Sequence, residues 1–126
     1  MQFPILLAVA IGGALGSLAR YAVASLVQSA AWPGFPWGIF VVNISGGFIM
    51  GVITELAALK LHFTPELRAF LTVGVLGGYT TFSTFSLDSA LLIERGAYMS
   101  AAAYMAGSAV LSVAALFAGL WIVRLL

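Results

Sequence analysis

The chain has 126 residues, of which 63% are hydrophobic and only 7% are charged, and its mean hydropathy is +1.14. A soluble domain carries about 25% charged residues to cover its surface, so this composition excludes an ordinary soluble protein. The net charge of +1 provides no basic field for nucleic acid, and the absence of cysteine excludes disulfides and thiolate metal sites.

Four long apolar runs follow one another along the chain, at residues 3–27, 37–59, 66–94 and 98–123. Each run meets the requirement of about 20 residues for a helix that crosses the hydrocarbon core. The separators are short and rich in turn residues, so residues 1–126 are expected to form a single domain. The sequence therefore predicts an all-α membrane protein with four transmembrane helices.

The first run contains a GxxxG motif at Gly12 and Gly16 and one charged residue, Arg20. Small residues at this spacing let helix backbones approach closely. Arg20 either extends to the membrane interface or serves a polar path. No basic residue precedes the run, which disfavours a cleaved signal peptide.

The second run carries Asn43 and a further GxxxG pair, Gly47 and Gly51. Asn43 lies roughly 9 Å into the run at 1.5 Å per helical residue. Its amide provides two N–H donors. These either bond to another helix, which is common in membrane bundles, or serve a polar path.

The third run begins with Thr64-Pro65-Glu66, a pattern typical of a helix N-terminus, and ends before Gly96, a residue suited to a helix C-terminus. Its middle, Gly74–Asp88, reads GVLGGYTTFSTFSLD. Each glycine costs about 1 kcal/mol of helix propensity, and the hydroxyls compete for backbone hydrogen bonds. We therefore expect a break in this helix at bilayer depth.

Non-helical backbone at this depth must be satisfied by protein, water or an ion. The carbonyl groups near Gly77–Thr80 would point their negative ends at a cation. If two antiparallel chains meet at the break, both contribute carbonyls to one site on the twofold axis. The alternative is a hydrogen-bonded kink without metal.

Phe82 and Phe85 are three residues apart and share one helix face beyond the break. Buried phenylalanine usually packs in a core, but the positive edge of an aromatic ring can also contact an anion. Weak donors would let an anion leave, whereas a full cation would trap it. The candidate donors are Ser83, Thr84 and the fourth-run stripe of Tyr104, Ser108 and Ser112, whose hydroxyls otherwise bond to their own helix.

The few charges give a feeble orientation bias. Four crossings place Lys60, Arg68 and Arg124 on one side, against Arg95 and Arg20 on the other. Such a chain can insert both ways, which permits an antiparallel dimer, although a small protein with few charges would show the same balance. Four helices are also too few to enclose a polar path, which favours oligomerisation.

Catalytic groups are sparse, and we do not expect an enzyme. The one histidine, His62, lies in a loop without partners at metal-ligand spacing. The acidic residues lie near the ends of the predicted spans, where they meet headgroups or water; they are Glu55, Glu66, Asp88 and Glu94.

The motifs GGALGSLARY, VNISGG and GGYTTFSTFS resemble those of the CrcB/Fluc family of fluoride channels, in the same order and over the whole chain. The resemblance implies an antiparallel dual-topology homodimer in the cell (inner) membrane, with the third helix broken near its middle. It also implies two fluoride pores, passive export of fluoride from the cytoplasm, and a structural sodium ion (Na+) at the dimer centre.

The resemblance also implies roles for individual residues. Sodium would be bound by the backbone carbonyls of Gly77 and Thr80. The pore would be formed by Asn43, Phe82, Phe85, Ser83, Thr84, Tyr104 and Ser108, with Arg20 and Asp88 in a vestibule. Two positions depart from the family pattern: Ile39 replaces a frequent threonine, and Asp88 replaces a frequent glutamate.

Two other functions remain as alternatives. A small proton-coupled multidrug antiporter has a similar dual-topology design, but it needs an ionisable carboxylate at depth, and the first run has none. A non-transporting assembly subunit would explain the glycines and the apolar surface. It would not explain a broken helix followed by paired phenylalanines.

Overall fold

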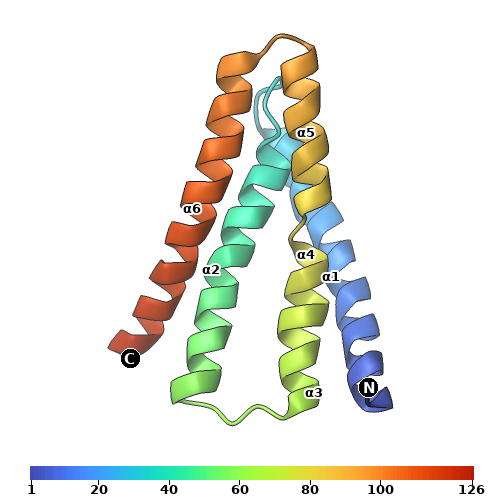
Figure 1. Ribbon diagram of the computed structural model, residues 1–126, viewed down its shortest axis with the longest axis vertical. Coiled ribbons are helices and arrows are strands. Elements are labelled where there is room, and N and C mark those ends of the chain that lie inside the picture. The colour runs from blue at the N-terminus through green and yellow to red at the C-terminus, as the bar shows by residue number, and fades with distance from the viewer.

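The computed structural model describes residues 1–126 and contains helices, turns and loops but no strand. Three helices are long and apolar enough to cross a membrane, namely α1 (Phe3–Ala30), α2 (Trp37–Leu59) and α6 (Tyr98–Leu125). Helix α1 continues three residues past the expected end at residue 27, and α6 continues two past residue 123. Figure 1 shows both chain termini at the same end of the bundle as the loop between α2 and α3.

Between α2 and α6 the chain forms four shorter elements in succession. These are α3 (Pro65–Arg68), the π-helical η1 (Ala69–Leu76), α4 (Gly77–Tyr79) and α5 (Phe82–Glu94). An eight-residue π-helix was not predicted from the sequence. π-Helical turns are rare and are frequently found at functional sites. The position of η1 therefore favours a functional site near α4 and α5, the elements that follow it.

The predicted ends of this segment are confirmed. The Thr64 side chain accepts a hydrogen bond from the Leu67 backbone N–H at 3.1 Å, and Pro65 occupies the first turn of α3. After α5, Gly96 has φ +77°, a left-handed conformation that glycine adopts without steric cost. Both signals are local, which is why the sequence alone identifies them.

The GxxxG glycines pack helices against each other within one chain. A Cβ atom added at Gly16 of α1 would lie 2.0 Å from the Val75 carbonyl oxygen of η1, and one at Gly51 of α2 would lie 2.1 Å from the Leu116 carbonyl oxygen of α6. Such contacts exclude any side chain. Because these motifs are used inside the protomer, they give no support to the expectation of oligomerisation.

Little of the chain is buried within the protomer. Only 18 of 126 residues are buried, whereas large apolar side chains such as Leu18 and Val110 are exposed, as expected for helices surrounded by lipid. At the end of the bundle that carries the chain termini, Arg124 of α6 forms an ion pair with Glu55 of α2 (Nε to Oε1, 2.6 Å). This pair joins the last turns of two helices that already pack through glycines.

Candidate functional site

The candidate site surrounds the point where helical conformation stops between α4 and α5 (Figure 1). Thr80 (φ −80°, ψ 157°) and Thr81 (φ −151°, ψ 125°) are extended. The Thr81 hydroxyl oxygen then caps α5 by accepting a hydrogen bond from the Thr84 backbone N–H at 3.2 Å. Gly46 of α2 leaves room for this turn, because a Cβ there would lie 2.3 Å from the Thr80 methyl group.

Asn43 braces the interruption from α2. Its Oδ1 accepts a hydrogen bond from the Thr81 backbone N–H at 2.9 Å, and its Nδ2 donates one to the Thr81 carbonyl oxygen at 3.1 Å. A single side-chain amide therefore satisfies both backbone polar groups of a buried residue outside a helix. One of the two Nδ2 hydrogens remains for another acceptor.

Several carbonyl groups before the interruption lack backbone donors. In a continuous helix the Gly77 carbonyl would accept from Thr81 N–H, but that N–H is bonded to Asn43. None of the backbone hydrogen bonds outside the helices ends on a carbonyl of Gly77–Thr80. Carbonyl oxygens are suitable ligands for a hard cation, so this donor set fits an alkali ion.

Arg20 approaches one of these carbonyl groups, that of Thr80. Its Nη1 lies 3.5 Å from the Thr80 carbonyl oxygen. The guanidinium therefore supplies positive charge at the interruption. The Gly77 carbonyl is free of any such contact, whereas a cation bound at Thr80 would meet this arginine.

Beyond the interruption, four of the predicted pore residues line one groove between α2, α5 and α6. The groove has a volume of about 460 Å³, and its lining includes Asn43, Phe82, Phe85 and Ser108. The two phenylalanine rings lie 5.4 Å apart between centroids, and Phe82 is 79% exposed. The Ser108 hydroxyl oxygen is buried without a hydrogen-bond partner. We refer to this space as the Phe82 groove.

Two predicted donors lie elsewhere. The hydroxyls of Ser83 and Thr84 cluster around the Thr81 hydroxyl, at 3.3 and 3.2 Å respectively. Neither residue lines the Phe82 groove. Both hydroxyls lie beside the Thr81 hydroxyl at the start of α5, and their role as pore donors stays a prediction.

Tyr104 contacts one residue of the Phe82 groove and one residue of a second cavity. Its ring is fully buried and packs on the Phe85 ring at 5.3 Å between centroids. Its hydroxyl donates a hydrogen bond to Asp88 Oδ2 at 3.1 Å. Tyr104 therefore contacts a groove residue through its ring and a residue of the second cavity through its hydroxyl.

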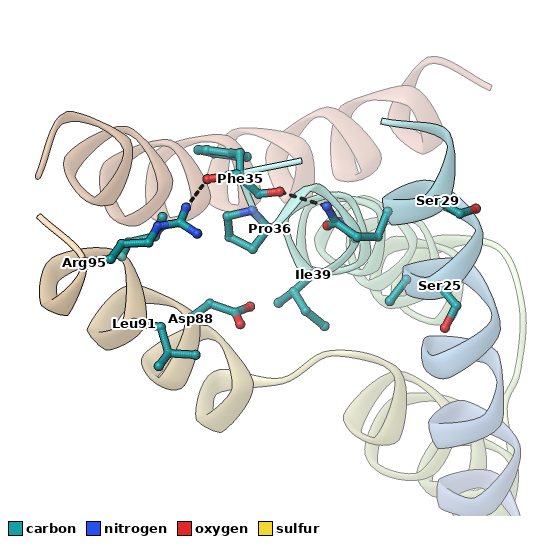
Figure 2. A pocket seen from close by; sticks show the side chains of 13 residues that line it. Ser25, Ser29, Phe35, Pro36, Ile39, Asp88, Leu91 and Arg95 are labelled. Carbon is teal, nitrogen blue, oxygen red and sulfur yellow. Dashed lines mark hydrogen bonds between the residues drawn. The ribbon is translucent and has the colours of Figure 1, made fainter. Parts of the chain in front are cut away.

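The second cavity, which we call the Asp88 cavity, has a volume of about 720 Å³ and lies between α1, α5 and the loop that precedes α2. Figure 2 shows the Asp88 carboxylate directed into this cavity toward Ile39. Ile39, which stands where the resembled family often has a threonine, gives the cavity wall opposite Asp88 an apolar side chain. The Gln28 side chain holds the loop by bonding to the Phe35 carbonyl and the Gly38 N–H, at 3.0 and 3.2 Å.

Sequence reasoning did not assign Gln28 or Arg95 to this cavity. A signal for Arg95 does exist, because Asp88, Leu91, Leu92 and Arg95 recur at i, i+3, i+4 and i+7, the spacing of one helix face. All four line the Asp88 cavity. No comparable local signal identifies Gln28, whose partners lie in the following loop and helix.

Comparisons with known proteins agree on one family. Residues 7–120 match a family described as "CrcB-like protein, Camphor Resistance (CrcB)". A protein of Nitrobacter winogradskyi named "Fluoride-specific ion channel FluC" is 52% identical over 126 residues, the whole length of both chains. A protein of the same name from Rhodospirillum centenum is 56% identical to this chain over 122 residues, which cover 95% of each chain. Another, from Rhizobium meliloti, is 50% identical over 119 residues, which cover 94% of this chain and 95% of the relative.

Proposed function

We propose that this chain, which belongs to the CrcB-like protein family, is a fluoride-specific ion channel that gives passive export of fluoride from the cytoplasm. It is a multi-pass protein of the cell membrane and a transporter rather than an enzyme. The name shared by relatives that are about half identical over nearly the full chain supports this function. Passive export of a toxic anion would give the cell fluoride resistance.

One structural observation carries the proposal: weak donors and aromatic rings follow one another from the Phe82 groove to the Asp88 cavity. The unpartnered Ser108 hydroxyl lies at the groove, Phe85 packs on Tyr104, and Tyr104 bonds to Asp88. Moving a small anion into a low-dielectric medium costs on the order of 20 kcal/mol. Closely spaced hydroxyls, amide hydrogens and ring edges replace part of its hydration without holding it permanently.

We propose that the segment from α3 to α5 is a fourth transmembrane span, interrupted at Thr80 and Thr81. Two observations support this assignment. Helical conformation stops at Tyr79 and resumes at Phe82, and Asn43 satisfies the backbone N–H and carbonyl of Thr81 between them, as backbone at bilayer depth requires.

We further propose an antiparallel, dual-topology homodimer with two pores. The nearly even distribution of positive charge supports insertion in both orientations. The Phe82 groove is open, and Phe82 is 79% exposed. A second copy over this face would enclose the groove and remove the ring from lipid.

We also propose a structural sodium ion at the centre of this dimer, bound by backbone carbonyl groups. The ligands would be the carbonyl oxygens of Gly77 and Thr80 from each chain, which lack backbone donors. The ion would hold the two interruptions together by neutralising converging carbonyl dipoles. Its binding requires the Arg20 guanidinium to turn away from the Thr80 carbonyl.

Fluoride efflux from liposomes that contain only the purified protein tests the function. We expect rapid fluoride release detected by a fluoride electrode, with little chloride release and no requirement for a proton gradient. Protein-free liposomes are the control. Equal release of chloride and fluoride would contradict selectivity. Fluoride release that requires an imposed proton gradient would instead favour the antiporter alternative.

A further inference from the structure

We infer that Arg95 gathers anions at the outer mouth of the Asp88 cavity, and this inference rests on the proposed fluoride conduction. Arg95 is the one lysine or arginine that lines this cavity. Figure 2 shows its side chain reaching from the C-terminal end of α5 toward the loop that holds Phe35. Because Arg95 is exposed, it can meet hydrated ions before they enter.

The positive charge of Arg95 lies close enough to Asp88 to offset its negative charge. Asp88 lies on α5 and Arg95 directly follows its last residue, so the two residues are seven apart on one helical face and roughly 10 Å apart along the helix axis. The Asp88 carboxylate repels any anion in the cavity. A cation at the mouth offsets that repulsion, since about 10 Å is the Debye length at 0.1 M ionic strength.

No other full charge lines this cavity. The lining parts of α1, of the following loop and of the start of α2 are uncharged. The neighbouring Glu94 lies on α5 but is absent from the lining. The field that an arriving anion experiences there is therefore set by Arg95 against Asp88. A cation near the entrance of a cavity raises the local concentration of anions and their rate of arrival.

A contact with the loop positions the guanidinium. Arg95 Nη2 donates a hydrogen bond to the Gly34 carbonyl oxygen. Gly34 has φ +101°, so the turn that presents this carbonyl favours glycine. The other guanidinium N–H groups remain available. The same contact suggests a purely mechanical role, in which Arg95 only ties α5 to the loop, and the experiment must separate the two.

The test measures fluoride efflux from liposomes for the wild type, Arg95→Gln and Arg95→Lys, with an impermeant salt on both sides. At about 10 mM ionic strength, where the Debye length is about 30 Å, we expect Arg95→Gln to lower flux roughly three- to tenfold. Arg95→Lys should retain most of the flux. At about 1 M, where the Debye length is about 3 Å, all three proteins should conduct equally. Arg68→Gln, which removes the same charge from α3, is the matched control and should conduct normally at both ionic strengths.

Two results would overturn the inference. Equal flux of the wild type and Arg95→Gln at low ionic strength would show that the charge is not used. A loss that persists at high ionic strength, with no recovery in Arg95→Lys, would assign Arg95 the mechanical role alone. These results differ from failure of the proposed function, in which the wild type itself would release no fluoride.

Discussion

At the scale of single residues, the Ser108 hydroxyl combines two properties that stability alone does not explain. It is buried, and it has no hydrogen-bond partner, although a buried polar group without a partner costs about 1–3 kcal/mol. It also lines the Phe82 groove. A buried hydroxyl without a protein partner can bind an ion that moves through the groove, and in the proposed channel this ion would be fluoride.

Replacing Ser108 with alanine should therefore separate stability from conduction. A hydrogen bond to a charged group contributes about 1.5–3 kcal/mol, so we expect Ser108→Ala to lower fluoride flux about tenfold or more. The melting temperature in detergent should stay equal or rise, because an unsatisfied buried hydroxyl is removed. Unchanged flux would reduce Ser108 to a packing residue. A melting temperature that falls together with flux would indicate a structural bond instead.

At the scale of the elements, close backbone contact fixes α1 against the segment that leads to the interruption. Gly16 contacts the backbone around Val75 and Tyr79, and Gly12 contacts the backbone around Phe70 and Gly74. The last turns before the interruption are thus held on one side by α1. On the other side, Asn43 of α2 binds Thr81.

This arrangement predicts opposite outcomes for two glycines of α1, Gly13 and Gly16. A Cβ at Gly16 would lie 2.0 Å from the Val75 carbonyl oxygen, whereas one at Gly13 would have nothing within 4 Å. Gly16→Ala should lower the melting temperature and the yield of folded protein, since backbone cannot move aside as a flexible side chain does. Gly13→Ala should behave as the wild type in the same thermal unfolding measurement. Equal stability of both variants would contradict the close contact of α1 with η1.

The elements also show what sequence can and cannot predict. Helix ends such as Thr64 and Gly96 depend on neighbouring residues, and both were predicted. The local weakness around Gly77–Thr80 was likewise visible as glycine and threonine. The π-helix η1 was not visible, because an extra residue per turn has no compositional signature of its own.

Hydrogen-bond and packing partners that lie far apart in the chain could not be predicted from the sequence either. Asn43 and Thr81 are 38 residues apart, so the sequence indicated an amide donor but not the backbone that receives it. The GxxxG spacing predicted close packing without saying which helix would be the partner. Ser83 and Thr84 were grouped with the pore donors by the family resemblance; their hydroxyls lie beside that of Thr81, and their role as donors stays a prediction.

At the scale of the whole molecule, α5 joins two spaces on one protomer. Its first turn presents Phe82 and Phe85 to the Phe82 groove, whereas Asp88 and the following Arg95, directly after the last residue of α5, line the Asp88 cavity. Tyr104 of α6 lies between them. We propose that fluoride passes along this face of α5, beside the interruption.

Fluoride efflux of Phe85→Ala measured beside Phe117→Ala tests that claim most directly. Phe85 lines the Phe82 groove and packs on Tyr104, whereas Phe117 of α6 is exposed and lines neither space. We predict that Phe85→Ala lowers fluoride flux about tenfold or more, by analogy with the loss of one charged contact, while Phe117→Ala conducts as the wild type. Wild-type flux in Phe85→Ala, with the protein folded and reconstituted, would contradict a path along α5.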